Sequence, residues 1–210
     1  MAAVIDHILW ATPDLEYGEK TIENITGIKT ARGGSHPGRG TRNSLISLGD
    51  NVYLEIIAPD PAQSLEGNLG ELLSDLPWPG IYTYAVRHND LESRAKHAEA
   101  LGLHIEGPVE RHRLQPDGAR LDWKLLYTHH PAFGVQIPFA IDWLETPHPS
   151  VSNPKGAILK EFHVLHPDAA SLSGLYRELE ISISVRGASK PGFLAVLETP
   201  KGEVVLQNPG

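Results

Sequence analysis

Residues 4–27 read VIDHILWATPDLEYGEKTIENITG, a strand-to-helix pattern from which the fold prediction starts. Its first eight residues, 4–11, are mostly apolar and predict a strand. The sequence Thr12-Pro13-Asp14 is typical of a helix start, with Thr12 as the N-cap and Pro13 at the first helical position. Gly27 predicts the end of that helix. One apolar helical face is expected between these limits, made of Leu15, Ile22 and Ile25.

The same order of elements recurs along the chain. Three strands are expected after the first helix, at 28–31, 41–48 and 51–58, so the first unit is strand-helix-strand-strand-strand. A second copy spans 81–143, with Asn89 as a helix N-cap and strands at 103–106, 119–127 and 135–143. A third copy spans 159–207. The repeat predicts an α+β fold of βαβββ modules, with curved mixed sheets and the helices on the outside.

Two stretches rich in proline, glycine and polar residues separate the copies. We therefore expect a first module at 1–60, a connector at 61–80, a second module at 81–145, a linker at 146–157 and a third, βαβββ-like module at 158–210. An unrelated α+β domain with three helices is the alternative interpretation of the pattern.

Composition narrows the classes of function. The 210 residues carry a formal net charge of −8 and no cluster of lysine and arginine, which argues against a nucleic-acid partner. Cysteine is absent, so disulfides, thiolate zinc sites and a cysteine nucleophile are excluded. No apolar run approaches the ~20 residues of a membrane span, and the first residues lack the pattern of a secretory signal. We expect a cytoplasmic protein that binds a small molecule.

The candidate metal ligands lie on strands of the first and third modules. His7 and Glu55 fall on inward-facing positions of two strands of one curved sheet, where imidazole and carboxylate can bind a divalent ion. The third module aligns His163 with His7 and Gln207 with Glu55. The expected metal set is therefore His7, Glu55, His163 and Gln207.

Two observations weigh against this metal site. The equivalent positions of the second module fall near 83–84 and 139–141, where no side chain is a good ligand. A strand histidine such as His7 is often only a hydrogen-bonded rim residue, and Glu55 has a possible ion-pair partner in Arg42. Metal site and structural pair are equally supported by the sequence.

A second group of polar residues lies in the stretch HPGRGTRN, residues 36–43. Arg39, Arg42 and Asn43 offer planar donors that suit a carboxylate, phosphate or carbonyl. The stretch is therefore interpreted as a binding site for such a group at the entrance of a pocket. The alternative is a solvated loop. Tyr53 and Trp123 are expected to line an apolar pocket, although strand aromatics more often belong to the core.

The first module also resembles a known family. The series IDHILWA with DL (residues 5–11 and 14–15), HPGRGTRN, LGD (48–50) and YLEIIA (53–58), together with IPFAIDW (137–143), is similar to the glyoxalase-like domain family. The resemblance implies the fold of the vicinal-oxygen-chelate superfamily, whose metal enzymes open a module with a histidine and close it with a glutamate. Those roles fall on His7 and Glu55. Gln207 and the odd number of modules depart from the pattern, and the third module would either pair across a dimer or pack as an accessory cap.

These observations leave three hypotheses. The first is an enzyme, a lyase, isomerase or dioxygenase, that uses Zn, Ni, Mn or Fe(II) as a Lewis acid, with Glu55 and His36 as the candidate catalytic residues. The second is a metal-free protein that binds or sequesters a small molecule. The third is a structural or regulatory homodimer with a vestigial pocket.

Overall fold

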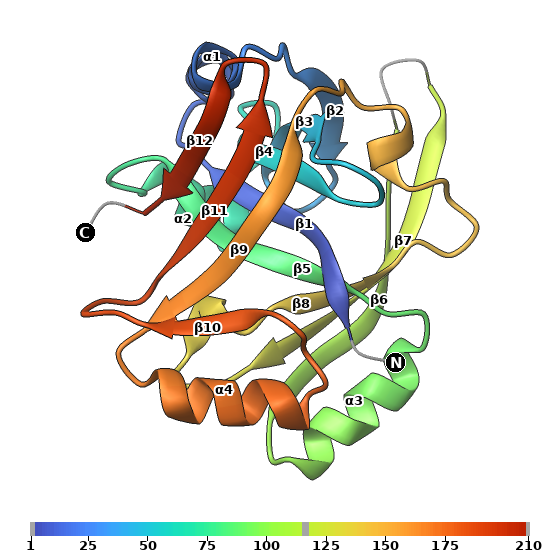
Figure 1. Ribbon diagram of the computed structural model, residues 1–210. Coiled ribbons are helices and arrows are strands. Elements are labelled where there is room, and N and C mark those ends of the chain that lie inside the picture. Colours follow the sequence, from blue (N-terminus) through green and yellow to red (C-terminus); the bar gives the residue numbers. More distant parts are fainter. Residues whose placement is uncertain (1–2, 115–117, 209–210) are drawn as a thin grey trace.

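The structure is a computed structural model that describes residues 3–114 and 118–208 (Figure 1). The first two modules form one curled eight-stranded sheet, and the third forms a separate sheet of four strands. The eight-stranded sheet and its helices comprise β1 (Val4–Ala11), α1 (Leu15–Thr26), β2 (Ala31–His36), β3 (Thr41–Ser47), β4 (Tyr53–Pro59), β5 (Gly80–Arg87), α3 (Leu91–Ala100), β6 (His104–Leu114), β7 (Arg120–His129) and β8 (Phe139–Asp142). The expected α+β fold with curved mixed sheets is confirmed.

Strand order in the large sheet is β2-β3-β4-β1-β5-β8-β7-β6, so β1 and β5 join the two modules at its centre. Within each module the first strand runs parallel to the last one. In the first module His7 lies opposite Tyr53, and in the second Ala85 lies opposite Phe139. The two halves therefore repeat the same pairing around the β1–β5 junction.

Helix starts differ from the predicted ones by one or two residues. The N-caps of α1 and α3 are Asp14 and Asp90, and that of α4 (Ala169–Glu178) is Asp168. Each of these carboxylates accepts a hydrogen bond from the backbone N–H three residues further on. The prediction of Thr12 and Asn89 as caps was wrong. The buried Thr12 hydroxyl instead donates to the carbonyl of Asp14, which fixes the strand-to-helix turn.

Two strands of the second module also have other bounds than expected. β6 continues through residue 114 instead of ending at 106. The strand expected at 135–143 is reduced to β8, because a short 3-10 helix, η1 (Gly134–Gln136), and then Pro138 come before it. Pro138 lacks the N–H that a ladder requires.

The third module has the predicted order of elements but a different pairing. Its strands β9 (Ile158–His166), β10 (Ser184–Gly187), β11 (Gly192–Thr199) and β12 (Gly202–Gln207) are arranged as β10-β9-β11-β12. The first strand therefore does not pair with the last one, as β1 pairs with β4, because β11 lies between them. The third module is a different sheet built from the same sequence of elements.

This four-stranded sheet packs on the convex side of the large sheet, where α1 and α3 also lie (Figure 1). Tyr84 of β5 is fully buried and contacts Phe162 and Phe193 of the small sheet at ring-centroid distances of 4.9 and 6.1 Å. Its hydroxyl lies 2.7 Å from that of Tyr176 in α4. Of the two arrangements that the sequence allowed, the structure shows the accessory one, packed within the same chain.

The outermost strands of the curled sheet, β2 and β6, approach each other at one end. A guanidinium N–H of Arg113 donates to the carbonyl oxygen of Gly33. Gly34 has a φ of +131°, and a Cβ at this position would lie 2.6 Å from the carbonyl oxygen of Leu114. The sheet is therefore held almost closed at this end, with a hollow on its concave side. Among the described residues, no helix has the length and apolar character needed to cross a bilayer.

Candidate functional site

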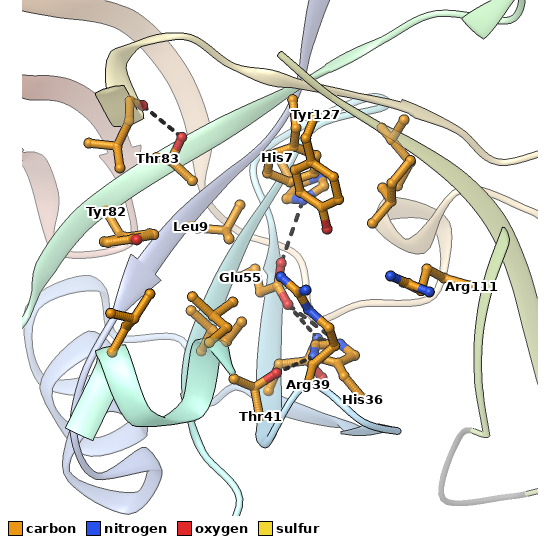
Figure 2. Close-up of a pocket in the computed structure, with 18 of the residues that line it drawn as sticks. His7, Leu9, His36, Arg39, Thr41, Glu55, Tyr82, Thr83, Arg111 and Tyr127 are labelled. Carbon is orange, nitrogen blue, oxygen red and sulfur yellow. Dashed lines mark hydrogen bonds and ion pairs between the residues drawn. The ribbon is translucent and has the colours of Figure 1, made fainter. Parts of the chain in front are cut away.

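The concave face of the large sheet encloses a cavity of about 740 Å³ (Figure 2). Strand alternation explains its lining, because on β4 the odd-numbered residues face the cavity and the even-numbered ones face the core behind the sheet. Most of the residues predicted for the site lie on its wall. These are His7, His36, Arg39, Asn43, Tyr53, Glu55 and Trp123.

His7 is held by the residue that precedes it. A register shift between Ile5 and His7 in the β1–β5 pairing forms a β-bulge, so Asp6 does not point to the opposite face. Asp6 Oδ1 lies 2.7 Å from His7 Nδ1. The other ring nitrogen of His7, Nε2, lies 3.5 Å from Glu55 Oε2. The imidazole is therefore fixed between two carboxylates, Asp6 behind it and Glu55 at the cavity wall.

Asp6 is fully buried and is the centre of a larger network. Arg87 Nε donates to its carboxylate at 2.8 Å, Trp143 Nε1 lies 3.2 Å away, and His148 Nε2 also lies at 3.2 Å. Burial raises the pKa of Asp6, but the hydrogen bonds with His148 and His7 outweigh it and hold that pKa well below its usual range. Asp6 therefore stays ionised and orients the His7 ring.

Glu55 is held from the other side by the 36–43 stretch. Asn43 Nδ2 donates to Glu55 Oε1 at 2.8 Å, and His36 Nε2 lies 3.8 Å from the same oxygen. His36 Nδ1 in turn lies 2.9 Å from the Thr41 hydroxyl. Burial lowers the pKa of His36, only partly opposed by the Glu55 carboxylate. His36 is therefore a neutral imidazole at neutral pH.

Tyr53 and Trp123 lie on the cavity wall, as predicted. The Tyr53 ring stacks on His7 with 4.5 Å between centroids and 15° between planes. Burial, followed by the nearby Glu55 and Asp6 carboxylates, raises the pKa of the Tyr53 hydroxyl well above its usual value. The aromatic part of the wall comprises Tyr53, Tyr82, Trp123, Tyr127, Phe139 and Trp143.

The two arginines of the 36–43 stretch separate. Arg39 lines the cavity, with its guanidinium carbon 5.7 Å from the centre of the Tyr127 ring. Arg42 lies outside it, because it occupies an outward position of β3, and it forms an ion pair with Glu16 at 2.9 Å. The substrate-binding role expected for Arg42 is therefore not supported by its position. The ion pair between Arg42 and Glu55 is also not formed, because Glu55 accepts a hydrogen bond from Asn43 instead.

His163 and Gln207 do not join the other predicted metal ligands. Both lie in the four-stranded sheet and are absent from the cavity wall. His163 instead lies 2.8 Å from Glu161. The expected four-ligand set is thus not assembled, because the third module packs behind the large sheet and pairs its strands in another order.

The second module supplies no replacement ligands. The register that places His7 opposite Tyr53 places Ala85 opposite Phe139, so Ala85 and Ile141 are the counterparts of His7 and Glu55. Over residues 3–114 and 118–208, no group of three or more histidine, aspartate or glutamate side chains has the arrangement of a metal site. His36 also lies near Glu55, but it does not complete a set of three ligands with His7 and Glu55, and two donors are fewer than the usual divalent-metal site uses. The residues present therefore do not fit the metal that the resemblance implied.

Sequence reasoning missed several residues of the site, Arg87 among them. Asp6 was missed because of the bulge, although an acidic residue inside an apolar strand is a signal that partners pair with it. Arg111 and Arg113 lie on the part of β6 that was not predicted to be a strand. His148 comes from the predicted linker, and only the fold brings it to Asp6.

Comparisons with known proteins agree with this architecture. Among solved structures, a hypothetical protein from Staphylococcus aureus superposes with a TM-score of 0.68 at 18% identity, covering 97% of this chain and 84% of that one. Methylmalonyl-CoA epimerase from Streptomyces coelicolor, in complex with 2-nitronate-propionyl-CoA, gives 0.53 at 16% identity, covering 71% and 100%. The same enzyme from Mycobacterium tuberculosis gives 0.50 at 18%, covering 70% and 90%.

At such identities the likeness shows a shared fold, that of the vicinal-oxygen-chelate superfamily. No curated protein matches the sequence significantly. A family model described as a glyoxalase-like domain matches residues 5–180, which is most of the chain. The chain therefore belongs to the glyoxalase-like domain family.

Proposed function

We propose that this protein is an enzyme, an isomerase or a lyase, that moves a proton at a carbon next to a carbonyl group of a small molecule. One observation carries the proposal. The side chains of Asp6, His7 and Glu55 form a row, in which Asp6 contacts His7 and His7 contacts Glu55. This Asp6–His7–Glu55 row ends at the wall of the cavity.

The burial of this row supports a catalytic role over a purely structural one. Asp6, His7 and Glu55 have exposed fractions of 0%, 3% and 6%. Burying polar and charged groups costs free energy unless they are paired, so a cavity that only had to hold an apolar ligand would gain nothing from them. A carboxylate that orients an imidazole through Nδ1 leaves Nε2 available for proton exchange.

The step can be written with these residues alone. Glu55, whose carboxylate accepts from Asn43, takes a proton from the carbon next to the carbonyl. The electron pair of the broken C–H bond moves toward the carbonyl oxygen, which becomes an enolate. For an inversion, a proton from water reaches the other face of the enolate while Glu55 keeps the one that it took and later releases it to solvent. For an elimination, a group on the neighbouring carbon leaves with its bonding electron pair. Neither outcome requires an oxidant or reductant.

A metal-assisted form of this chemistry would use His7 and Glu55 as ligands and polarise the same carbonyl. Because the cavity offers no third histidine or carboxylate in a suitable arrangement among the described residues, our proposal assigns no step to a metal.

A second candidate function is sequestration of a small molecule without chemistry. The aromatic wall and the apolar counterparts Ala85 and Ile141 favour it, since they shape a cavity and bring no reactive group.

Proton exchange with solvent separates the two functions. The protein is incubated in D₂O with a panel of small 2-oxo and 2-hydroxy acids and CoA thioesters, and deuterium at the carbon next to the carbonyl is followed by NMR. We expect enzyme-dependent exchange with at least one compound, lost in Glu55→Gln and His7→Gln and retained in Arg42→Gln, whose side chain lies outside the cavity. Compounds that bind tightly and never exchange would favour sequestration instead.

A further inference from the structure

Arg111 lines the cavity without an anionic partner among the described residues. Arg111 extends from β6 into the cavity, across from Glu55 (Figure 2). Its Nε is buried and donates to no partner within residues 3–114 and 118–208, and its Nη1 makes only a 3.4 Å contact with the carbonyl oxygen of Glu110. An unsatisfied buried donor destabilises the folded protein, so this guanidinium is suited to an acceptor that enters from solution.

Of the other arginines near the cavity, three already have hydrogen-bond or ion-pair partners, and Arg39 has an aromatic ring as its contact. Arg113 donates to Gly33 and joins the two edges of the sheet. Arg39 lies over the Tyr127 ring. Arg87 is paired with Asp6 and Arg42 with Glu16. Arg111 is therefore a wall guanidinium without an anionic partner among the described residues, and its two terminal nitrogens can donate the parallel hydrogen bonds that a carboxylate accepts.

An aromatic surface lies directly beside this guanidinium. Trp123 is the cross-strand partner of Arg111 in the β6–β7 pairing. The Trp123 and Trp143 rings have centroids 5.7 Å apart, and Tyr127 and Phe139 continue the surface at a centroid distance of 5.6 Å. A cavity of about 740 Å³ with such a wall is much larger than a three-carbon acid needs. The surface suits a ring or a similar flat apolar group.

We propose that the ligand is a carboxylic acid with an aromatic body, its carboxylate bound by Arg111 and its ring placed against Trp123 and Trp143. The opposite wall of the cavity then presents Glu55 and His7 to the middle of the molecule. This last part rests on the proposed proton-transfer function, whereas the binding of an aromatic acid does not.

Three probes test the ligand class by calorimetry and by the fluorescence of the wall tryptophans. Phenylpyruvate carries both features, its carboxamide lacks the charge, and pyruvate lacks the ring. We expect phenylpyruvate to bind at least about tenfold more tightly than either of the others, because a charged bidentate pair and the ring burial each contribute about that factor. Equal affinities for the acid and the amide would overturn the proposal.

Variants of Arg111 give a second, independent test. Arg111→Gln should remove the preference for acid over amide, and Arg111→Lys should restore part of it by returning the charge without the planar edge. Arg42→Gln is the matched control, since it removes a guanidinium that is paired with Glu16 outside the cavity. An unchanged acid preference in Arg111→Gln protein with an unaltered melting temperature would contradict the assignment.

The proposed ligand class and the proposed proton transfer can be contradicted independently of each other. Preferential binding of phenylpyruvate without deuterium exchange at its C3 would support the ligand class and count against proton transfer. Exchange of neutral compounds without any preference for acids would overturn the ligand class and leave the proton-transfer function standing.

Discussion

Asp6 and His7 are neighbours in the sequence, yet their side chains meet on the same side of β1, with Asp6 Oδ1 2.7 Å from His7 Nδ1. In a regular strand they would point to opposite faces. The bulge at this position therefore turns a dipeptide into an oriented imidazole with a carboxylate behind it.

The first prediction concerns Asp6 as a positioning residue. Asp6→Asn removes the charge that holds the His7 ring, so we expect the exchange rate to fall by roughly 10–100-fold, as for other partners of this kind. Ligand affinity should change by less than about twofold, because Asp6 does not line the cavity. Calorimetry and NMR exchange on the same samples check this split. An equal loss of affinity and rate would indicate that the substitution only disturbs the fold.

Asp6→Asn should also change how the free energy of unfolding depends on pH under acidic conditions. A carboxylate with a lowered pKa stabilises the folded state above its unfolded pKa, near 3.8, and this contribution is lost as the pH falls through the lowered value. The free energy of unfolding of the native protein should therefore fall more steeply below pH 4 than that of Asp6→Asn. Urea titrations at a series of pH values measure it.

The second prediction concerns His36. Its lowered pKa means that the unfolded chain binds a proton more readily than the folded one, so stability falls as the pH drops below the unfolded value of about 6.5. His36→Gln removes this titration, and the loss of stability between pH 7 and pH 5 should become shallower. A slope identical to that of the native protein would show that His36 titrates normally in the fold.

The third prediction concerns the contact between β2 and β6. Gly34→Ala combines a φ of +131° with a Cβ 2.6 Å from the Leu114 carbonyl oxygen, so it should force the strands apart and cost roughly 2–4 kcal/mol. Gly38→Ala is the control, since Gly38 also has a positive φ, +72°, but no atom would lie within 4 Å of the new Cβ. We expect it to cost about 1 kcal/mol. Equal melting temperatures of the two variants would contradict the contact.

The fourth prediction concerns metal binding. Zn, Ni or Mn is added to the purified protein, and unbound metal is then removed by gel filtration. Because His7 and Glu55 are the donors that the cavity brings together, we expect less than a stoichiometric amount of metal to remain bound. Elemental analysis gives the answer, with His7→Ala and His163→Ala as paired variants. Metal that persists, and is lost in His7→Ala alone, would show that two protein donors suffice.

The sequence predicted most of the first module because its signals are local, although the strand expected at 28–31 lies instead at 31–36. The apolar run at 4–11 matches β1 residue for residue, and inward alternation brought His7 and Glu55 to one face. Asp6 was missed because a bulge depends on the partner strand β5 and not on β1 itself.

Other failures have the same origin in tertiary structure. Alignment of His163 with His7 assumed that equal element order gives equal strand pairing, but β9 pairs with β11 and β10 instead of with β12. Arg111 was not considered because a polar, weakly periodic stretch gave no strand signal at 107–114, although β6 extends through it. These residues are placed by long-range pairing, which a single sequence does not encode locally.

The near-symmetry of the two halves has a consequence for engineering. Ala85 and Ile141 occupy in the second half the places that His7 and Glu55 occupy in the first. A double replacement by histidine and glutamate at those two sites would set four donors around one hollow, and the scaffold would then be a starting point for a designed metalloprotein. The present sequence has ionisable side chains at these positions in one half and apolar ones in the other, so the two halves differ in side chains at a shared backbone position.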